Sequence, residues 1–224
     1  MLILAFDTTV AACSVAVWRD GEVLSAARET MAQGQAEALM PMIVAVMAKA
    51  NVAYVDLDRI AVTVGPGSFT GVRVGLAAAR GLGLAAGKPV IGVMTTEALA
   101  GAVPQEERKA GTQILAAVDT KRGDLYVQIF DAKLAELGAV QVMPAADLAA
   151  YVALGPVRAV GDAAAIAVAA LGPRALLSAA DALPDPAGIA AIAATRPPVS
   201  GGPLPVYVRA PDAALPQHGG RLRP

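Results

Sequence analysis

The sequence predicts an α/β protein built from two similar halves, each with a mixed β-sheet flanked by helices. Short strand-like runs alternate with longer helix-like runs along the 224 residues. The pattern Ile-Leu-Ala-Phe-Asp-Thr at residues 3–8 returns as Ile-Leu-Ala-Ala-Val-Asp-Thr at residues 114–120. Because the elements after each of these strands also come in the same order, we interpret the chain as an internal duplication.

The first half, residues 1–104, begins with three strand-like segments that predict a meander. The dipeptide Asp20-Gly21 is a strong hairpin signal between the second and the third. Apolar residues then recur with helical spacing, at positions 39, 42, 43, 46 and 47. The expected elements are strands at residues 2–9, 12–19, 22–29, 59–64 and 88–93, and helices at residues 33–50, at 71–86 and from Thr95.

The second half, residues 105–224, repeats this order and ends in a tail rich in proline and glycine. A turn at Arg122-Gly123 separates its first two strands, and Gly161-Asp162 opens an alanine-rich helix. The expected elements are strands at residues 114–120, 125–130, 134–142 and 157–160, and helices from Pro144, after Asp162 and at 186–195.

Composition indicates a folded protein that contacts another protein. Hydrophobic residues make up 56% and charged residues 17%, against a usual charged share of about 25%. This excludes a disordered chain. No uncharged run approaches the roughly 20 residues that a membrane-spanning helix needs. With so few charges to cover its surface, the protein is expected to bury part of it against a partner.

Charge and cysteine content narrow the function further. A formal charge of −1 and 4% aromatic residues argue against tight nucleic-acid binding by this chain alone. The single cysteine, Cys13, excludes a disulfide framework. The first residues lack the basic region of a signal peptide. We therefore expect a cytoplasmic protein with no membrane association.

Histidine is nearly absent from the sequence. The one histidine, His218, lies in the tail, whereas zinc and iron sites usually draw on several His or Cys side chains. A Ser-His-Asp triad would need this same residue. We therefore expect no metal site and no catalytic residues, and a peptidase is the least favoured function.

Residues 65–71, Gly-Pro-Gly-Ser-Phe-Thr-Gly, connect a predicted strand to a predicted helix. Free N–H groups at a helix start suit anions. The loop nevertheless departs from both common phosphate-loop patterns, because Thr70 stands where each needs a glycine. Two interpretations stay open: a vestigial phosphate site, or a rigid turn with Thr70 as the N-cap. The candidate phosphate-site residues are Asp7, Thr8, Gly65, Gly67, Ser68, Thr70 and Arg73.

The helix at residues 71–86 carries a small residue at every fourth position. A glycine inside a helix costs about 1 kcal/mol relative to alanine, so this stripe indicates close approach of another helix. The helix at 33–50 is apolar nearly all round, with Met40 and Val44 opposite Leu39 and Ile43, which predicts one face for the core and one for a partner. The approaching helix belongs either to the same chain or to another subunit, and we expect an interface between molecules. The predicted interface residues are Leu39, Met42, Ile43, Val46, Met47, Val72, Gly75, Leu76, Ala79 and Gly83.

The segment from Asp119 to Asp124 reads as a charged hairpin. Such segments are usually solvated turns, although Lys121 and Arg122 could meet a phosphate. Asp162 follows a predicted strand and is a weak candidate for the border of a nucleotide pocket.

Several segments resemble the TsaB (YeaZ) family. The opening strand through Ala16 is similar to the start of that family, and residues 65–76 are similar to its most specific signature. Residues 119–126 resemble its Asp-Ala-Arg…Glu-Val-Tyr segment. Residues 205–209 resemble its Pro-x-Tyr-Leu-Arg motif, with Val208 for Leu. The matches extend over nearly the whole chain.

This resemblance implies a duplicated actin-like and sugar-kinase-like fold of the ribonuclease-H type. It implies a non-catalytic paralogue of TsaD, in the tRNA modification that places threonylcarbamoyl on the adenosine beside the anticodon. The implied partners are a TsaD-like transferase, bound through the two helices at 33–50 and 71–86, a TsaE-like ATPase, a second copy when alone, and tRNA through the complex. One departure is Gln35-Ala36, where many relatives have a His-Ser/Thr pair.

We therefore expect a scaffold that activates a catalytic paralogue. It would hold no cofactor of its own, with ATP or ADP bound only at the interface of the complex. The alternative is a nucleotide-dependent phosphotransferase or ATPase that uses Asp7 and Asp119.

Overall fold

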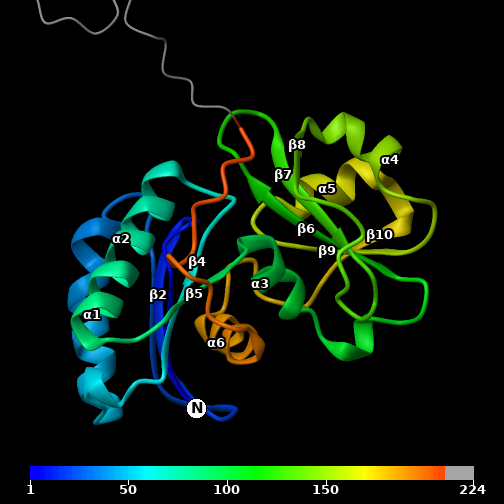
Figure 1. Cartoon of the computed structure of the whole chain (residues 1–224). Coiled ribbons are helices and arrows are strands. Elements are labelled where there is room, and N and C mark those ends of the chain that lie inside the picture. The colour runs from blue at the N-terminus through cyan, green and yellow to red at the C-terminus, as the bar shows by residue number, and fades with distance from the viewer. Residues whose placement is uncertain (210–224) are drawn as a thin grey trace, which may run out of the picture.

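The computed structural model describes residues 1–209 and contains two five-stranded sheets (Figure 1). The first sheet has the order β3-β2-β1-β4-β5, and the second has the equivalent order β8-β7-β6-β9-β10. In both, the first three strands pair antiparallel and the remaining pairs are parallel. This repeated topology confirms the predicted duplication. The strands are β1 (Leu2–Asp7), β2 (Ala12–Arg19), β3 (Glu22–Thr30), β4 (Arg59–Thr63), β5 (Val90–Val93), β6 (Gln113–Asp119), β7 (Leu125–Phe130), β8 (Gln141–Met143), β9 (Val157–Val160) and β10 (Ala175–Leu177).

The helices form three layers around the sheets (Figure 1). Two long helices cover the outer face of the first sheet, two short ones cover the outer face of the second, and two lie between the sheets. No helix within residues 1–209 is long and apolar enough to cross a membrane. The helices are α1 (Gln35–Ala50), α2 (Phe69–Ala86), α3 (Thr95–Gly101), α4 (Leu148–Tyr151), α5 (Ala164–Leu171) and α6 (Pro186–Thr195); short 3-10 turns lie at Tyr54–Asp56, Gln105–Glu107, Ala145–Asp147 and Gly172–Arg174.

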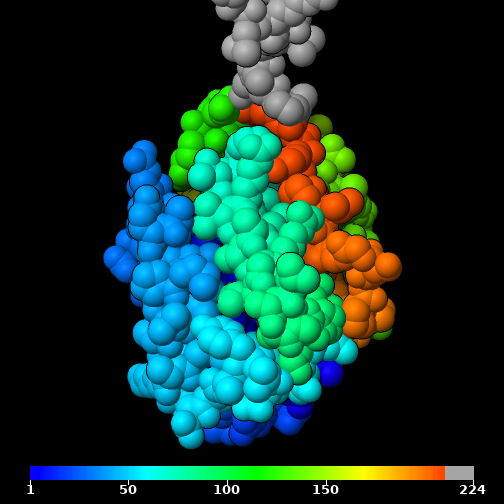
Figure 2. All heavy atoms as spheres, turned by 60° about the vertical axis from the view of Figure 1, so that its left-hand side comes forward, coloured from blue at the N-terminus to red at the C-terminus, as the bar shows by residue number. Residues whose placement is uncertain are grey.

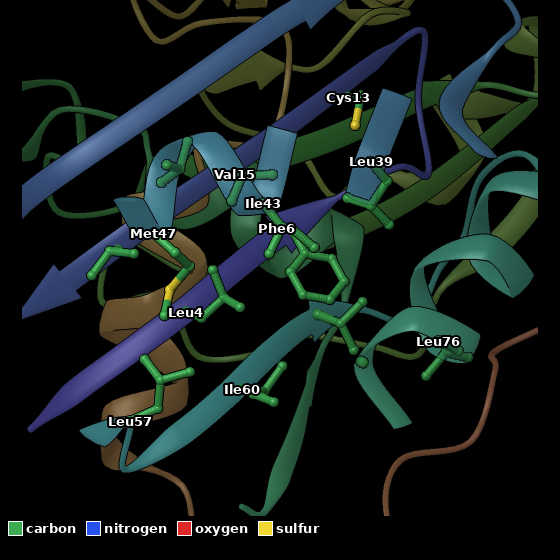
Figure 3. Close-up of a cluster of buried hydrophobic side chains, with 14 of the residues drawn as sticks. Leu4, Phe6, Cys13, Val15, Leu39, Ile43, Met47, Leu57, Ile60 and Leu76 are labelled. Atoms are coloured by element: carbon green, nitrogen blue, oxygen red, sulfur yellow. The ribbon is translucent and has the colours of Figure 1, made fainter. Parts of the chain in front are cut away.

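Strand β1 divides its side chains between two cores because successive residues point to opposite faces. Leu4 and Phe6 face α1 and α2, where Ile43 packs against them (Figure 3). Ile3 points to the other face, where it meets Ile189 of α6. All of these side chains are fully buried, so β1 is the centre of the first half.

The last helix of each half covers the sheet of the other half. Helix α6 lies on the first sheet, and α3 lies on the second, where Leu99 packs with Ile114. The predicted division between residues 104 and 105 falls between the two sheets, but it assigns α6 to the second half. The structure corrects that assignment, because α6 covers the face of β1 that carries Ile3.

Both long helices begin at other residues than the sequence pattern predicts. Helix α1 starts at Gln35 because Gly34, with φ of 100°, adopts the left-handed conformation just before it. Helix α2 starts at Phe69 rather than at residue 71. Its N-cap is Ser68 and not Thr70, since the Ser68 hydroxyl accepts a hydrogen bond from the Gly71 N–H at 3.2 Å.

The strand predicted at residues 134–142 is mostly a turn and loop. The Asp131 carboxylate accepts hydrogen bonds from the backbone N–H groups of Lys133 and Ala135, both at 2.8 Å. Leu134 takes a positive φ of 67° in this turn. Strand β8 therefore contains only Gln141–Met143.

The small residues of α2 face the first sheet rather than another helix. A Cβ atom on Gly71 would lie 1.9 Å from the Thr8 carbonyl oxygen, and one on Gly75 would lie 2.7 Å from the Thr8 hydroxyl. A Cβ on Gly83 would lie 2.6 Å from a methyl group of Val90. The stripe thus lets the helix backbone lie directly on the ends of β1 and β5. The prediction that this stripe contacts a second helix is therefore wrong for Gly71, Gly75 and Gly83, which contact the first sheet.

The predicted interface residues also pack within the chain, so the structure corrects their assignment. They form the core between the first sheet and the helix pair, where α1 and α2 also contact each other. A partner would touch other side chains, on the outer surface of the two helices. Of the predicted interface residues, Met42 is half-buried, and these nine are buried: Leu39, Ile43, Val46, Met47, Val72, Gly75, Leu76, Ala79 and Gly83.

Substitution of two α2 glycines by alanine should have opposite effects on stability. Gly71→Ala forces its Cβ into the Thr8 carbonyl, so we expect it to lower the free energy of unfolding by about 3 kcal/mol or more. Gly81 is the matched control, because a Cβ there meets nothing within 4 Å. Gly81→Ala should raise stability by about 0.5–1 kcal/mol. Urea unfolding of the three proteins measures both effects, and equal stabilities would contradict this position of α2.

Candidate functional site

A cleft of about 650 Å³ lies between the two halves. Its first wall follows β1 and the loop before α2 and is largely uncharged, whereas its second wall follows β6 and carries the charged side chains. The segment of residues 203–209, here called the strap, forms a third wall. The lining residues are Thr9, Val10, Ala11, Ala32, Gln35, Pro66, Gly67, Ser68, Phe69, Val118, Asp119, Thr120, Lys121, Arg122, Tyr126, Asp162, Val206, Tyr207, Val208 and Arg209.

Asp7 is buried at the end of β1 and does not line this cleft. Its Oδ1 accepts hydrogen bonds from the Thr9 backbone N–H at 3.1 Å, the Thr9 hydroxyl at 2.6 Å and the Thr63 hydroxyl at 2.5 Å. Its Oδ2 has no partner. Burial raises the pKa of Asp7, against the opposing effect of these donors. Of the two carboxylates that the alternative phosphotransferase or ATPase would use, Asp119 lines the cleft and Asp7 does not.

The loop before α2 occupies the space directly beyond β1. The Ser68 N–H donates to the Thr9 carbonyl at 2.7 Å, and a Cβ on Gly67 would lie 2.2 Å from the same oxygen. The Thr8 hydroxyl donates to the Gly71 carbonyl at 2.7 Å. The loop and the end of β1 thus form hydrogen bonds with each other, as expected for a rigid turn.

The other candidate phosphate-site residues are dispersed. Gly67 and Ser68 line the cleft, but Gly65 lies under the strap, where a Cβ would meet the Val206 carbonyl at 2.7 Å. Thr70 is exposed outside the cleft, and Arg73 stacks over the Phe69 ring. The structure therefore does not bring the predicted set together as one anion site.

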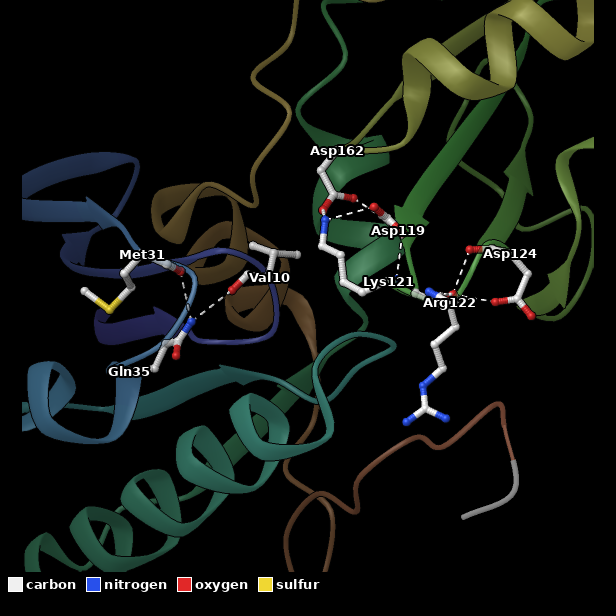
Figure 4. Close-up of polar contacts among 9 residues, drawn as sticks. Val10, Met31, Gln35, Asp119, Lys121, Arg122, Asp124 and Asp162 are labelled. Carbon is white, nitrogen blue, oxygen red and sulfur yellow. Dashed lines mark hydrogen bonds and ion pairs between the residues drawn. The ribbon is translucent and has the colours of Figure 1, made fainter. Parts of the chain in front are cut away.

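The hairpin between β6 and β7 supplies most of the cleft's charges (Figure 4). The Lys121 ammonium lies 2.9 Å from Asp119 and 3.6 Å from Asp162. Its hydrogen bond with Asp119 raises the pKa of Lys121. Burial alone would raise the pKa of Asp119, but Lys121 outweighs it and leaves that pKa lowered. At Asp162 burial dominates, so its pKa is raised.

Two further cations lie at the same end of the molecule. The Arg122 side chain extends from the hairpin toward the side where α2 and the strap lie (Figure 4). Arg209 of the strap forms an ion pair with Asp124. Residue patterns alone indicate Arg122 and Asp162 only weakly and do not indicate Tyr207 or Arg209. These last two are indicated only by the resemblance of residues 205–209 to the family.

Gln35, the first residue of α1, connects this helix to the turn after β1 and to the loop after β3. Its side-chain amide donates to the carbonyls of Met31 at 3.2 Å and Val10 at 3.4 Å (Figure 4). Within residues 1–209 no group of three His, Cys, Asp or Glu side chains could hold a metal ion. His218 lies outside the described residues.

The outer surface of the α1–α2 pair is a second candidate site (Figure 2). Met40 and Val44 project from α1, and Leu84, 87% exposed, projects from α2. Glu37 and Lys49 are the charged residues of α1. We call this surface the helix-pair face; its exposed small and apolar residues are Ala36, Met40, Pro41, Val44, Ala45, Ala48, Ala77, Gly81, Leu84 and Ala85.

The buried Asp7 predicts a pH dependence of stability. A carboxyl whose pKa is raised in the folded state stabilises the fold below its ordinary pKa, and this contribution is lost as the pH rises through the folded value. Asp7→Asn keeps an acceptor for Thr9 and Thr63 and offers an N–H to the unpartnered Ser14 hydroxyl, opposite it on β2. We expect the variant to be more stable than the natural chain at neutral pH, with a gap that narrows in acid. Urea unfolding across pH measures this, and a constant gap would contradict a raised pKa at Asp7.

Comparison with known proteins identifies the family. The model described as TsaD, tRNA N6-adenosine threonylcarbamoyltransferase, matches residues 28–165, more than half of the chain. The tRNA threonylcarbamoyladenosine biosynthesis protein TsaB of Escherichia coli is 39% identical over 56% of this chain and 53% of its own length. The chain thus spans about half the length of the curated TsaB relatives that it matches.

Two further matches cover nearly the whole chain. An uncharacterized protein of Mycobacterium tuberculosis is 35% identical over 94% of this chain and 93% of its own. A crystal structure from Pseudomonas aeruginosa, described as similar to peptidase YEAZ, has a TM-score of 0.79 at 28% identity, with 93% of this chain and 99% of that chain covered. The duplicated actin-like and sugar-kinase-like fold predicted from the sequence is confirmed. The chain therefore belongs to the TsaB (YeaZ) family, within the group that the threonylcarbamoyltransferase model describes.

Proposed function

We propose that this protein acts in the biosynthesis of threonylcarbamoyladenosine in tRNA, as a non-catalytic subunit that binds and activates a TsaD-like transferase. Curated relatives carry TsaB names from that pathway. The single observation that carries the proposal is the helix-pair face, on which exposed apolar and small residues gather along the two longest helices.

The composition of this face supports a partner of matching apolar character. A helix on the surface of a monomer normally turns a polar face to water, but α1 turns Met40 and Val44 outward. Burying apolar surface contributes about 25 cal/mol per Å². Covering the face would therefore contribute favourably to binding, and Glu37 and Lys49, in the first and last turns of α1, would orient the partner.

The position of Asp7 supports a role without catalysis. The carboxylate is buried beneath Thr9 and Thr63, so a substrate in the cleft would not reach it. We propose that the chain holds no cofactor of its own and that ATP or ADP binds only where the chain meets its partner. A TsaE-like ATPase would join the pair, and a second copy would cover the helix-pair face when the transferase is absent.

A charge introduced on the helix-pair face should break the pairing. Leu84→Glu and Val44→Glu place a carboxylate where the partner would exclude water, so we expect the dissociation constant for the TsaD-like protein of the same organism to rise at least about tenfold. Light scattering after gel filtration, on the mixture and on each protein alone, measures the complex.

Leu154→Glu is the matched control. Leu154 is 94% exposed but lies in the second half, before β9. The Leu154→Glu variant should leave both the dissociation constant of the complex and the thermal midpoint unchanged. If Leu84→Glu and Leu154→Glu bind the TsaD-like protein with the same dissociation constant, the helix-pair face is not the binding surface. Separate peaks for the natural chain and the transferase would remove the proposed role itself.

A further inference from the structure

Two exposed aromatic rings meet at the mouth of the cleft. Phe69 is 44% and Tyr207 42% exposed, and their ring centroids lie 5.1 Å apart. The chain contains one Trp, four Tyr and three Phe, all within the described residues. The other aromatic side chains are less exposed, and of these Tyr126 also lines the cleft. Buried or half-buried are Phe6, Trp18, Tyr54, Tyr126, Phe130 and Tyr151.

Arg73 holds this ring pair in place. Its guanidinium lies 3.6 Å from the centroid of Phe69 and 5.9 Å from that of Tyr207. Its Nε also donates a hydrogen bond to the Tyr207 hydroxyl at 3.1 Å. The rings are therefore ordered before any ligand arrives, which lowers the entropic cost of binding.

The strap is anchored at other points than the rings. The Val206 N–H donates to the Val64 carbonyl at 2.8 Å, and Arg80 donates to the Pro203 carbonyl at 2.7 Å. Arg209 adds an ion pair with Asp124. The strap thus has polar anchors on both halves of the protein in addition to the contacts of Tyr207 with Arg73 and Phe69.

Several cations lie beside the ring pair. Arg122, Lys121 and Arg209 line the same cleft as the two rings, where Lys121 is paired with Asp119 and Asp162, and Arg209 with Asp124. Helix α2 carries Arg73 and Arg80 and no acidic residue along its whole length. Single-stranded nucleic acid is bound by this combination of aromatic faces and cations, because each base has a π-face and each nucleotide a phosphate.

We propose that an unpaired RNA base stacks on the exposed faces of Phe69 and Tyr207, and that its neighbouring phosphate faces Arg122. This inference rests on the proposed function, in which the complex acts on RNA. A contact of one nucleotide agrees with the formal charge of −1: it adds to the RNA affinity of a complex and would be weak in the chain alone.

The test is photocrosslinking to a short stem-loop RNA that carries a thiouridine in its loop, with a fully paired duplex as the control RNA. It is run on the chain alone and on its mixture with the TsaD-like protein, and mass spectrometry locates the crosslink. We expect crosslinks at Phe69 or Tyr207 with the loop RNA only. Phe69→Ala and Tyr207→Ala should each reduce RNA affinity about tenfold, whereas Tyr207→Phe keeps the stack and should retain it.

A charge variant gives a second readout. Arg122→Gln should lower the slope of log affinity against log salt by about one. Arg19→Gln is its control. Arg19 is exposed at the last residue of β2 and does not line the cleft, so this substitution should leave RNA affinity and its salt dependence unchanged. Thermal unfolding verifies that every variant folds.

The outcomes separate this inference from the proposed function. Crosslinks confined to other residues, or an affinity unchanged by both alanine variants, would overturn the stacking site even where light scattering shows the complex. Crosslinks from Tyr207 to the partner protein instead of RNA would reassign the ring pair to a protein contact and also overturn it. Crosslinking is also measured on the chain alone. The stacking site is therefore tested even if the chain does not bind the TsaD-like protein.

Discussion

The close contact between α2 and the end of β1 is the constraint on which the rest of the structure depends. The helix backbone lies against the Thr8 carbonyl and hydroxyl, and only glycine fits at Gly71 and Gly75. This contact fixes three things at once: the outward direction of Leu84, the position of Phe69 at the cleft, and the closure of the space beyond Asp7. A helix displaced outward by one methyl group would change all three.

Much of the fold could be predicted from the sequence, because hydrophobic periods report directly on burial. The alternation in β2 placed Cys13, Val15 and Val17 together, and they do share the core under α1. The helix at Pro186–Thr195 was predicted at its observed limits. The strand expected at 134–142 failed because Asp131 competes for the backbone N–H groups, a local hydrogen-bonding effect that a hydrophobic pattern does not record.

The candidate sites were predicted less well, for a physical reason. Small residues on a helix indicate that something approaches closely, but they do not say whether it is a helix or a sheet. Leu39 and Met40 are adjacent apolar residues, and only the direction of the sheet decides which one is buried. The contact of Phe69 with Tyr207 joins residues distant in the chain. The sequence carries no local signal for it.

The exchange of α3 and α6 between the two sheets has a consequence for the origin and the integrity of the chain. Two copies of a single half that swapped their last helices would form this same arrangement, so the fused chain is equivalent to a domain-swapped dimer joined by a linker. Neither half is complete when separated, since residues 1–104 alone would leave Ile3 and Ile91 without the cover of α6. A cut between the two sheets would therefore separate each sheet from a helix that covers it, α6 from the first and α3 from the second.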